Sequence, residues 1–166
     1  MKKIKFLLIS FMIRFWSFNL NAADWTMASG YPKSNFHTQN IMKFIDEVKA
    51  NTSVNINLNP NDTLIKLDAI KTSLQRGQIP IGEIRFGIYG NEDPMYILAG
   101  LPFIAPDYAS AWLLKEVKHE YLQNLFNKKG LRILYTSPWP GQGFYTKTPV
   151  NGVSDFKGKK LRIYST

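Results

Sequence analysis

Hydrophobic positions along the chain switch repeatedly between a spacing of two and a spacing of three to four residues, which is typical of alternating strands and helices. The alternation is clearest at Val54, Ile56 and Leu58, which are separated by asparagines. The elements expected in this part are a strand at 25–28, a helix over 36–50, a strand at 54–58, a helix over 67–74 and a strand at 79–86. This βαβαβ order predicts an α/β fold, with a largely parallel sheet and helices on its faces.

The second half of the chain begins with the longest expected helix, over 108–127. Its predicted buried face consists of the apolar positions Leu114, Val117, Tyr121 and Leu125. Beyond it the pattern predicts a strand at 131–135, a strand at 144–146, a helical turn at 155–158 and a strand at 160–164. The run Pro138-Trp139-Pro140-Gly141 interrupts this pattern and is the candidate crossover between two lobes.

The composition is that of a globular protein without covalent cross-links. Of the 166 residues, 45% are hydrophobic and 20% are charged, which excludes disorder, collagen and coiled coil. The sequence has no cysteine, and this excludes disulfides, cysteine-ligated zinc, iron–sulfur clusters and thiol nucleophiles. A domain of this length buries roughly 70% of the surface that its unfolded chain exposes, so a hydrophobic core can form without such links.

The first 23 residues have the order of a secretory signal peptide. Three lysines precede an apolar run over 6–13, and the small residues Ala22 and Ala23 follow it. The run is too short to span a bilayer, which needs about 20 apolar residues. We therefore predict export from the cytoplasm. Because Arg14 interrupts the apolar region, an uncleaved membrane anchor and a cytosolic amphipathic start are the alternatives.

The net charge of +9 comes in part from that segment. Four of the 21 basic residues lie in the first 20 positions, so removal of the signal leaves 17 basic against 12 acidic residues, a net charge of +5. The remaining basic residues come close together only at 128–129 and 157–160, and an ordinary solvated surface explains both groups. We expect no nucleic-acid partner. A basic nucleic-acid binder would show an affinity that collapses with salt.

Motifs of common hydrolases and nucleotide-binding proteins are missing. The sequence has no G-x-S-x-G elbow, and its two histidines, His37 and His119, are widely separated and complete no zinc-binding H-E-x-x-H. The glycines near Gly158 and Gly82 complete neither a phosphate loop nor a G-x-G-x-x-G turn. One alternative from another functional class stays open, a small secreted hydrolase that uses a pair of carboxylates chosen from Glu83, Glu92 and Asp93.

Arg162 is the single residue whose position favours a binding role. In the expected strand at 160–164, Leu161 and Ile163 occupy one face and Arg162 the other. The apolar pair would anchor the strand, while the guanidinium would point into a cleft beside Trp139, Gln142 and Phe144. A guanidinium binds a carboxylate through two parallel hydrogen bonds. The pattern alone fits an exposed arginine on an edge strand as well.

Several short motifs occur in a characteristic order. They are ASGYP at 28–32, NFHT at 35–38, GQIPIGE at 77–83, NEDP at 91–94, LPF at 101–103, PWP at 138–140 and DFKGKKLR at 155–162. No single motif is decisive. Their ordered set resembles the solute-binding subunit of the tripartite ATP-independent periplasmic (TRAP) transporters, and the resemblance covers essentially everything after the signal.

The resemblance implies a type II-like periplasmic-binding-protein architecture. Its two α/β lobes would close around a small organic acid and deliver it to the membrane permease of a TRAP transporter, which an ion gradient drives. It implies no catalysis, no cofactor and no metal, and we expect a monomer. Arg162 matches the family arginine that receives the substrate carboxylate. A second family arginine falls near Gln142, whose amide can donate a hydrogen bond but cannot neutralise a charge.

Contacts from the first lobe are expected at the carboxyl end of the sheet, where open α/β sheets collect ligands. The candidates are Ser29 and Tyr31, after the first expected strand, and Glu83, Arg85 and Asn91, in the later part of the third expected strand and after it. Loop packing and surface hydrogen bonding are the alternative interpretation of these residues. Trp139 and Phe144 either wall the pocket or fill the core between the lobes.

The resemblance also implies how the chain is divided. A signal peptide over 1–23 is followed by a first α/β lobe over 24–138, which is mostly present but incomplete, and by the crossover and the start of a second lobe over 139–166. Family members continue beyond the strand that holds Arg162. We therefore expect the chain to represent the N-terminal part of a longer receptor.

Overall fold

A computed structural model of the protein describes residues 23–162. Its sheet has three parallel strands in the order β2-β1-β3, with β1 at Ala23–Ala28, β2 at Val54–Asn59 and β3 at Ile81–Gly82. The parallel α/β arrangement predicted from the hydrophobic pattern is confirmed. The predicted signal peptide lies outside the described residues except for Ala23.

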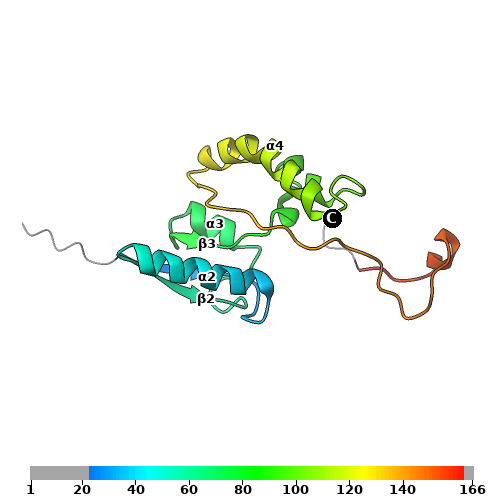
Figure 1. Ribbon diagram of the computed structural model, residues 1–166, viewed down its shortest axis with the longest axis horizontal. Helices are drawn as coiled ribbons and strands as arrows, with labels where there is room; N and C mark the ends of the chain where they lie inside the picture. Colours follow the sequence, from blue (N-terminus) through cyan, green and yellow to red (C-terminus); the bar gives the residue numbers. More distant parts are fainter. Residues whose placement is uncertain (1–22, 163–166) are drawn as a thin grey trace, which may run out of the picture.

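Helix α2 (Phe36–Asn51) lies along the sheet and covers one of its faces (Figure 1). It begins where predicted because the side chain of Asn35 caps it, accepting a hydrogen bond of 2.8 Å from the backbone N–H of His37. Its buried residue Ile41 packs with Met27, Ile56 and Ile81 of the sheet, and the other predicted apolar positions, Phe44, Ile45 and Val48, join this cluster.

Helix α3 (Ile70–Gln75) covers the opposite face of the sheet. Met27 and Ala28 are successive residues of β1, so their side chains point to opposite faces. Met27 packs in the cluster beneath α2, whereas Ala28 packs with Ile70 and Ile79. The sheet is therefore covered by one helix on each face. Helix α3 begins at Ile70, later than the predicted start at residue 67.

Strand β3 is much shorter than the predicted strand over 79–86. Its pairing with β1 ends at Ala28 and Gly82, because β1 itself ends there and leaves later residues without a neighbour. The backbone N–H of Glu83 still donates to the carbonyl of Ala28 at 2.9 Å. The chain then turns into the 3-10 helix η1 (Phe86–Tyr89).

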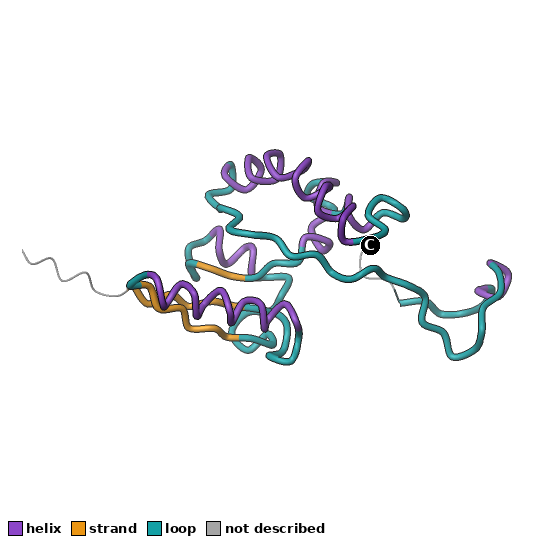
Figure 2. The backbone as a smooth tube through the Cα atoms, in the orientation of Figure 1, coloured by secondary structure: helices purple, strands orange, loops and turns teal. Residues whose placement is uncertain are grey.

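A second core lies between the 3-10 segments and the long helix. Two further 3-10 helices, η2 (Pro94–Tyr96) and η3 (Leu98–Gly100), lead to α4 (Tyr108–Asn127). Tyr89 and Tyr96 are buried there against Leu122 and Phe126 of α4. In the view shared by Figure 1 and Figure 2, α3 and β3 lie between α2 and α4.

Helix α4 has the predicted bounds but buries a different face. Asp107 caps it, accepting a hydrogen bond of 2.7 Å from the backbone N–H of Ser110. The buried residues are Lys118, Leu122 and Phe126. Of the predicted positions, Leu125 packs on the second core and Leu114 is half-buried, whereas Val117 and Tyr121 are exposed. Val117 is 80% exposed. The helix is turned in this way because its C-terminal half packs on the tyrosines of the 3-10 segments and not on the sheet.

After α4 the described chain is extended and contains no strand, so the strands predicted at 131–135, 144–146 and 160–162 are wrong. A strand needs a hydrogen-bonded neighbour, and this stretch pairs with none of the described strands. Leu131 and Ile133 instead pack on the second core. Residues 163 and 164 of the last predicted strand lie outside the described residues.

The last part of the described chain, deep orange to red in Figure 1, loops away from α2, α3 and α4, and its red end turns back toward them. The helical turn predicted at 155–158 overlaps the 3-10 helix η4 (Val153–Phe156) in this segment. The division into lobes at residue 139 stays a prediction. None of the helices between residues 23 and 162 is both long and apolar enough to cross a membrane.

Candidate functional site

The carboxyl edge of the sheet brings two predicted site residues into direct contact. Ala28 and Gly82 are the last paired residues of β1 and β3, so Ser29 and Glu83 leave the sheet side by side. Ser29 is fully buried, and its hydroxyl donates a hydrogen bond to the carboxylate of Glu83. The backbone N–H of Tyr31 donates to Ser29 Oγ at 3.3 Å. Three of the predicted first-lobe residues therefore form one connected unit.

The loop after β2 closes over the same edge. The backbone N–H of Ser29 donates to the Asn59 carbonyl at 3.0 Å, and that of Asp62 donates to the Ser29 carbonyl at 3.2 Å. The Tyr31 carbonyl accepts a hydrogen bond of 2.9 Å from the N–H of Asn61. Asn61 and Asp62 both have φ near 58°, a left-handed conformation that Asn and Asp tolerate better than most residues. Backbone hydrogen bonds thus fix where Ser29 and Tyr31 lie.

Glu83 is partly withdrawn from water. Burial raises the pKa of its carboxyl group, and the hydrogen bond from Ser29 opposes this effect only in part. Burial also raises the pKa of the Tyr135 hydroxyl, and the charge of Glu83 adds to that shift. Glu83 is therefore a partly buried carboxyl group that is held in place by its hydrogen bond from Ser29.

Trp139 lies against an aromatic cluster beside this edge. Its ring centroid is 5.1 Å from Tyr31, 4.4 Å from His37 and 5.3 Å from Phe36, in each case in an edge-to-face arrangement. The indole is still 41% exposed. Trp139 therefore packs on the body of the molecule and also presents an aromatic surface to solvent.

His37 is a residue of this cluster that sequence reasoning missed. Its side chain is 6% exposed, and its Nε2 has no hydrogen-bond partner among the described residues. Burial lowers the pKa of the imidazole and so favours its neutral form. The available signals were its place two residues after the cap Asn35 and inside the NFHT motif. A lone helical histidine otherwise fits a surface or a satisfied core position.

Three other predicted site residues lie on the extended C-terminal part of the chain. The side-chain amide of Gln142 donates to the Pro140 carbonyl at 3.1 Å. Phe144 is 76% exposed, and its ring lies 4.9 Å from that of Phe156. Arg162 is exposed at the end of the described chain. The structure does not gather Gln142 and Phe144 with the Ser29–Glu83 unit.

The remaining two candidates follow β3. Arg85 is half-buried and directly precedes η1, and Asn91 is exposed in the turn between η1 and η2. The described contacts of Asn91 do not include the Ser29–Glu83 unit. Among the nine residues predicted for the site, the carboxyl edge thus gathers Ser29, Tyr31 and Glu83, with Trp139 beside them.

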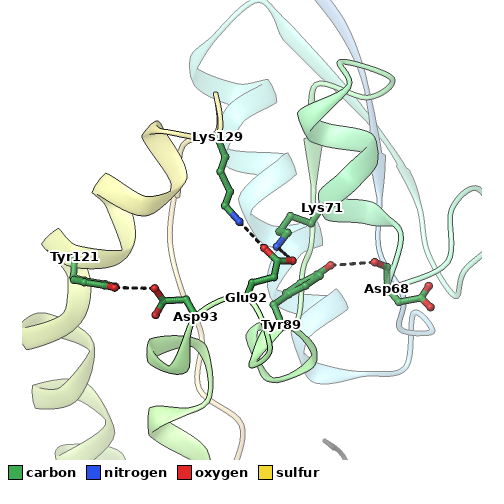
Figure 3. Close-up of polar contacts among 7 residues, drawn as sticks. All are labelled: Asp68, Lys71, Tyr89, Glu92, Asp93, Tyr121 and Lys129. Carbon is green, nitrogen blue, oxygen red and sulfur yellow. Dashed lines mark hydrogen bonds and ion pairs between the residues drawn. The ribbon is translucent and has the colours of Figure 1, made fainter.

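A second group of charged residues lies between α3, the 3-10 segments and α4 (Figure 3). Glu92 accepts hydrogen bonds from Lys71 of α3 and from Lys129, which follows α4. The Lys71 side chain is 2% exposed, and its ammonium lies 3.9 Å from the centroid of the Tyr89 ring. Burial lowers the pKa of Lys71, and its contact with Glu92 opposes that shift.

These contacts bear on the alternative of a carboxylate-dependent hydrolase. Burial by itself would raise the pKa of Glu92, but the hydrogen bonds from Lys129 and Lys71 outweigh it, so its pKa is lowered. Asp93 accepts hydrogen bonds from the Tyr121 hydroxyl at 2.7 Å and from the Met95 backbone N–H at 2.8 Å. The carboxylates of Glu92 and Asp93 thus each link separate segments of the fold through hydrogen bonds. This geometry gives the hydrolase alternative no support. Residues 23–162 contain no group of His, Asp and Glu suited to hold a metal ion.

Residues 27–166 match the sequence profile of the bacterial extracellular solute-binding proteins, family 7. None of the curated proteins matches the chain.

Solved structures give a more detailed likeness. DctP7, a Bordetella pertussis extracytoplasmic solute receptor binding pyroglutamic acid, is 38% identical, with a TM-score of 0.82 over 87% of this chain and 48% of its own. DctP6, a second such receptor from B. pertussis, is 34% identical, with a TM-score of 0.69 over 71% and 40%. A marine metagenome TRAP solute-binding protein specific for pyroglutamate is 35% identical, with a TM-score of 0.76 over 82% and 45%. The chain spans about half the length of these structures or less.

Proposed function

The chain belongs to the bacterial extracellular solute-binding proteins of family 7, the DctP family, and from this premise we propose that it is a receptor for a small organic acid. The observation that carries the proposal is its likeness, at 34%, 35% and 38% identity, to three receptors that bind pyroglutamate. Pyroglutamate has one carboxylate and a small lactam ring with an amide N–H and a carbonyl. We propose a cyclic acid of this kind as the ligand.

Arg162 is the proposed anchor of the ligand carboxylate. Its guanidinium carries the fork of donors that matches a carboxylate, and its place in the DFKGKKLR motif supports this role. Gln142, lying where a second arginine occurs in the resemblance, would add a hydrogen bond without adding charge. A single fixed positive charge suits a monocarboxylate better than a dicarboxylate.

The Ser29–Glu83 unit is the proposed contact for the uncharged part of the ligand. Its support is the position at the carboxyl edge of a parallel sheet, the buried hydroxyl of Ser29 and the raised pKa of Glu83. The neighbouring Tyr31 and the exposed indole of Trp139 would form apolar walls. Arg85, Asn91 and Phe144 stay candidate contacts at the periphery of the proposed ligand site.

The proposed role needs binding and release without bond breaking, so we propose a receptor and not an enzyme. A ligand held by Arg162 on one side and by the Ser29–Glu83 unit on the other would favour a closed arrangement of two lobes. That closed form would be recognised by the membrane permease of a TRAP transporter. Such a receptor acts in the periplasm, which the predicted signal peptide over 1–23 would allow it to reach.

A ligand panel tests this proposal. Thermal unfolding of the full-length protein is followed with pyroglutamate, a linear dicarboxylate, a sugar acid and an uncharged sugar. A ligand that binds only the folded state at a hundred times its Kd stabilises by about 2.7 kcal/mol, which raises the melting temperature measurably. We expect the largest rise with pyroglutamate and none with the uncharged sugar. No rise with any of the acids would contradict the proposal.

A further inference from the structure

The Nε2 atom of the His37 imidazole lies inside the aromatic cluster without a hydrogen bond to any described residue. Only 6% of the residue is exposed. Buried polar atoms in native proteins are nearly always paired, so each unpaired one needs an explanation. A phenylalanine would fill this place without leaving a nitrogen unsatisfied.

Aromatic rings enclose this histidine. The ring centroids of Phe36 and Trp139 lie 4.1 Å and 4.4 Å from the imidazole, and that of Tyr31 lies 6.4 Å away. Trp139 is the member of the cluster that comes from the extended segment after α4, which is not paired with the described strands. Ring contacts and not a sheet therefore hold the indole over His37, and it can move without breaking a strand.

The cluster is joined to the proposed ligand site by short backbone links. The Thr38 hydroxyl, one residue after His37, donates to the Tyr31 carbonyl at 3.3 Å. The Tyr31 backbone N–H in turn donates to Ser29 Oγ at 3.3 Å, and Ser29 donates to Glu83. The first turn of α2 is thus fixed beside the carboxyl edge of the sheet, next to where a ligand ring is proposed to lie.

We propose that His37 is a specificity-determining residue of this receptor. Its Nε2 pairs with a polar group in the ring of a cyclic acid, and this ligand displaces the Trp139 indole from the imidazole. This inference rests on the proposed function and narrows its ligand class to small rings that carry an amide or carbonyl. A neutral imidazole has one N–H donor and one acceptor, so it suits the N–H or the carbonyl of a lactam. Burial, which lowers the pKa of His37, maintains that neutral form.

The test compares two ligands of the same shape. Isothermal titration calorimetry of the full-length protein measures the affinity for pyroglutamate and for cyclopentanecarboxylate, which has the carboxylate and the ring size but no lactam. His37→Phe keeps an aromatic ring and removes both nitrogens. We expect this variant to bind pyroglutamate about tenfold more weakly and to bind cyclopentanecarboxylate as the native protein does.

A matched control and a conservative variant accompany this measurement. His119→Phe alters the other histidine, which is exposed on α4, and should leave both affinities unchanged. His37→Gln keeps a donor and an acceptor and should retain part of the preference for pyroglutamate. We expect His37→Phe to melt no lower than the native protein, because it buries no unpaired nitrogen.

The outcomes that contradict the inference can be told apart from those that contradict the proposed function. Unchanged affinity of His37→Phe for pyroglutamate, or an equal loss for both acids, would overturn the role of His37 and leave the receptor function standing. Failure of the native protein to bind either acid would overturn the proposed function itself. Nitrogen NMR of the native protein gives a readout that needs no variant. Pyroglutamate should shift the His37 Nε2 resonance, and an unshifted resonance at saturation would refute the pairing.

Discussion

At the scale of single residues, Glu83 is a carboxyl group held at the carboxyl edge of the sheet. It follows β3 directly, accepts a hydrogen bond from the buried Ser29 and is itself partly buried, which raises its pKa. The hydrogen bond from Ser29 favours the charged form of Glu83 and opposes the effect of burial only in part.

The pH dependence of stability tests the environment of Glu83. Because its folded pKa lies above its unfolded value near 4.5, its contribution to stability is complete below that pH and is lost as the pH rises through the folded pKa. Glu83→Gln removes the titrating group. We expect it to raise the free energy of unfolding at pH 7 and to flatten its dependence on pH above 4.5, as measured by urea unfolding. Glu47→Gln, on the exposed side of α2, should keep the native slope, and the same slope in Glu83→Gln would contradict this prediction.

The role proposed for Arg162 is tested by two substitutions. Removing one partner of a buried charge pair costs roughly 2–5 kcal/mol, so Arg162→Ala should weaken the binding of pyroglutamate by about 30-fold to several thousand-fold. Arg162→Lys should also lose affinity, because a point charge does not reproduce the guanidinium fork. Calorimetry on the full-length protein measures both. Arg132→Ala, an exposed arginine that follows α4, is the control and should bind normally. Native affinity in Arg162→Ala would remove the residue from the site.

At the scale of elements, the helices were predictable because their signals are local. Asn35 and Asp107 cap α2 and α4 through contacts within three residues, and the periodic apolar positions continue from those caps. The strands after α4 were not predictable in the same way. Alternation at 131–135 indicates an extended chain, but a strand also needs a neighbouring edge, and that depends on distant parts of the chain.

The residues of the candidate site also differ in whether local sequence signals could predict them. Ser29 was predictable because it directly follows the first expected strand, and the topology of a parallel sheet gathers such residues. Glu83 lay within the expected strand over 79–86 and follows β3 because that strand ends at Gly82. His37 was not predictable, because what makes it unusual is its burial beneath Trp139, which lies far along the chain. The buried face of α4 was mispredicted for a similar reason, since Tyr89 and Tyr96 select it.

The charged group around Glu92 joins three elements, and its partners should differ in their effect on stability. Lys71→Met leaves Glu92 paired with Lys129 and fills a similar volume, so we expect a change of no more than about 1.5 kcal/mol. Glu92→Ala leaves the ammonium of Lys71 buried without its carboxylate and should destabilise by up to about 3 kcal/mol. Urea unfolding measures both variants. A larger loss in Lys71→Met than in Glu92→Ala would contradict this assignment.

At the scale of the whole molecule, the proposed function depends on two parts acting together. The helices and the sheet carry the Ser29–Glu83 unit, whereas Arg162 lies at the end of the described chain, beyond η4. An acid that contacts both parts stabilises the arrangement in which they approach each other. The carboxylate is therefore the group on which recognition should depend most strongly.

Calorimetry with pyroglutamate and its methyl ester tests that claim most directly. The two compounds share the lactam ring, but the ester lacks the negative charge that Arg162 is proposed to bind. For the full-length protein we predict saturable binding of pyroglutamate and an affinity for the ester that is at least about 30-fold weaker. Equal affinities for the two compounds, or no binding of pyroglutamate, would contradict the account.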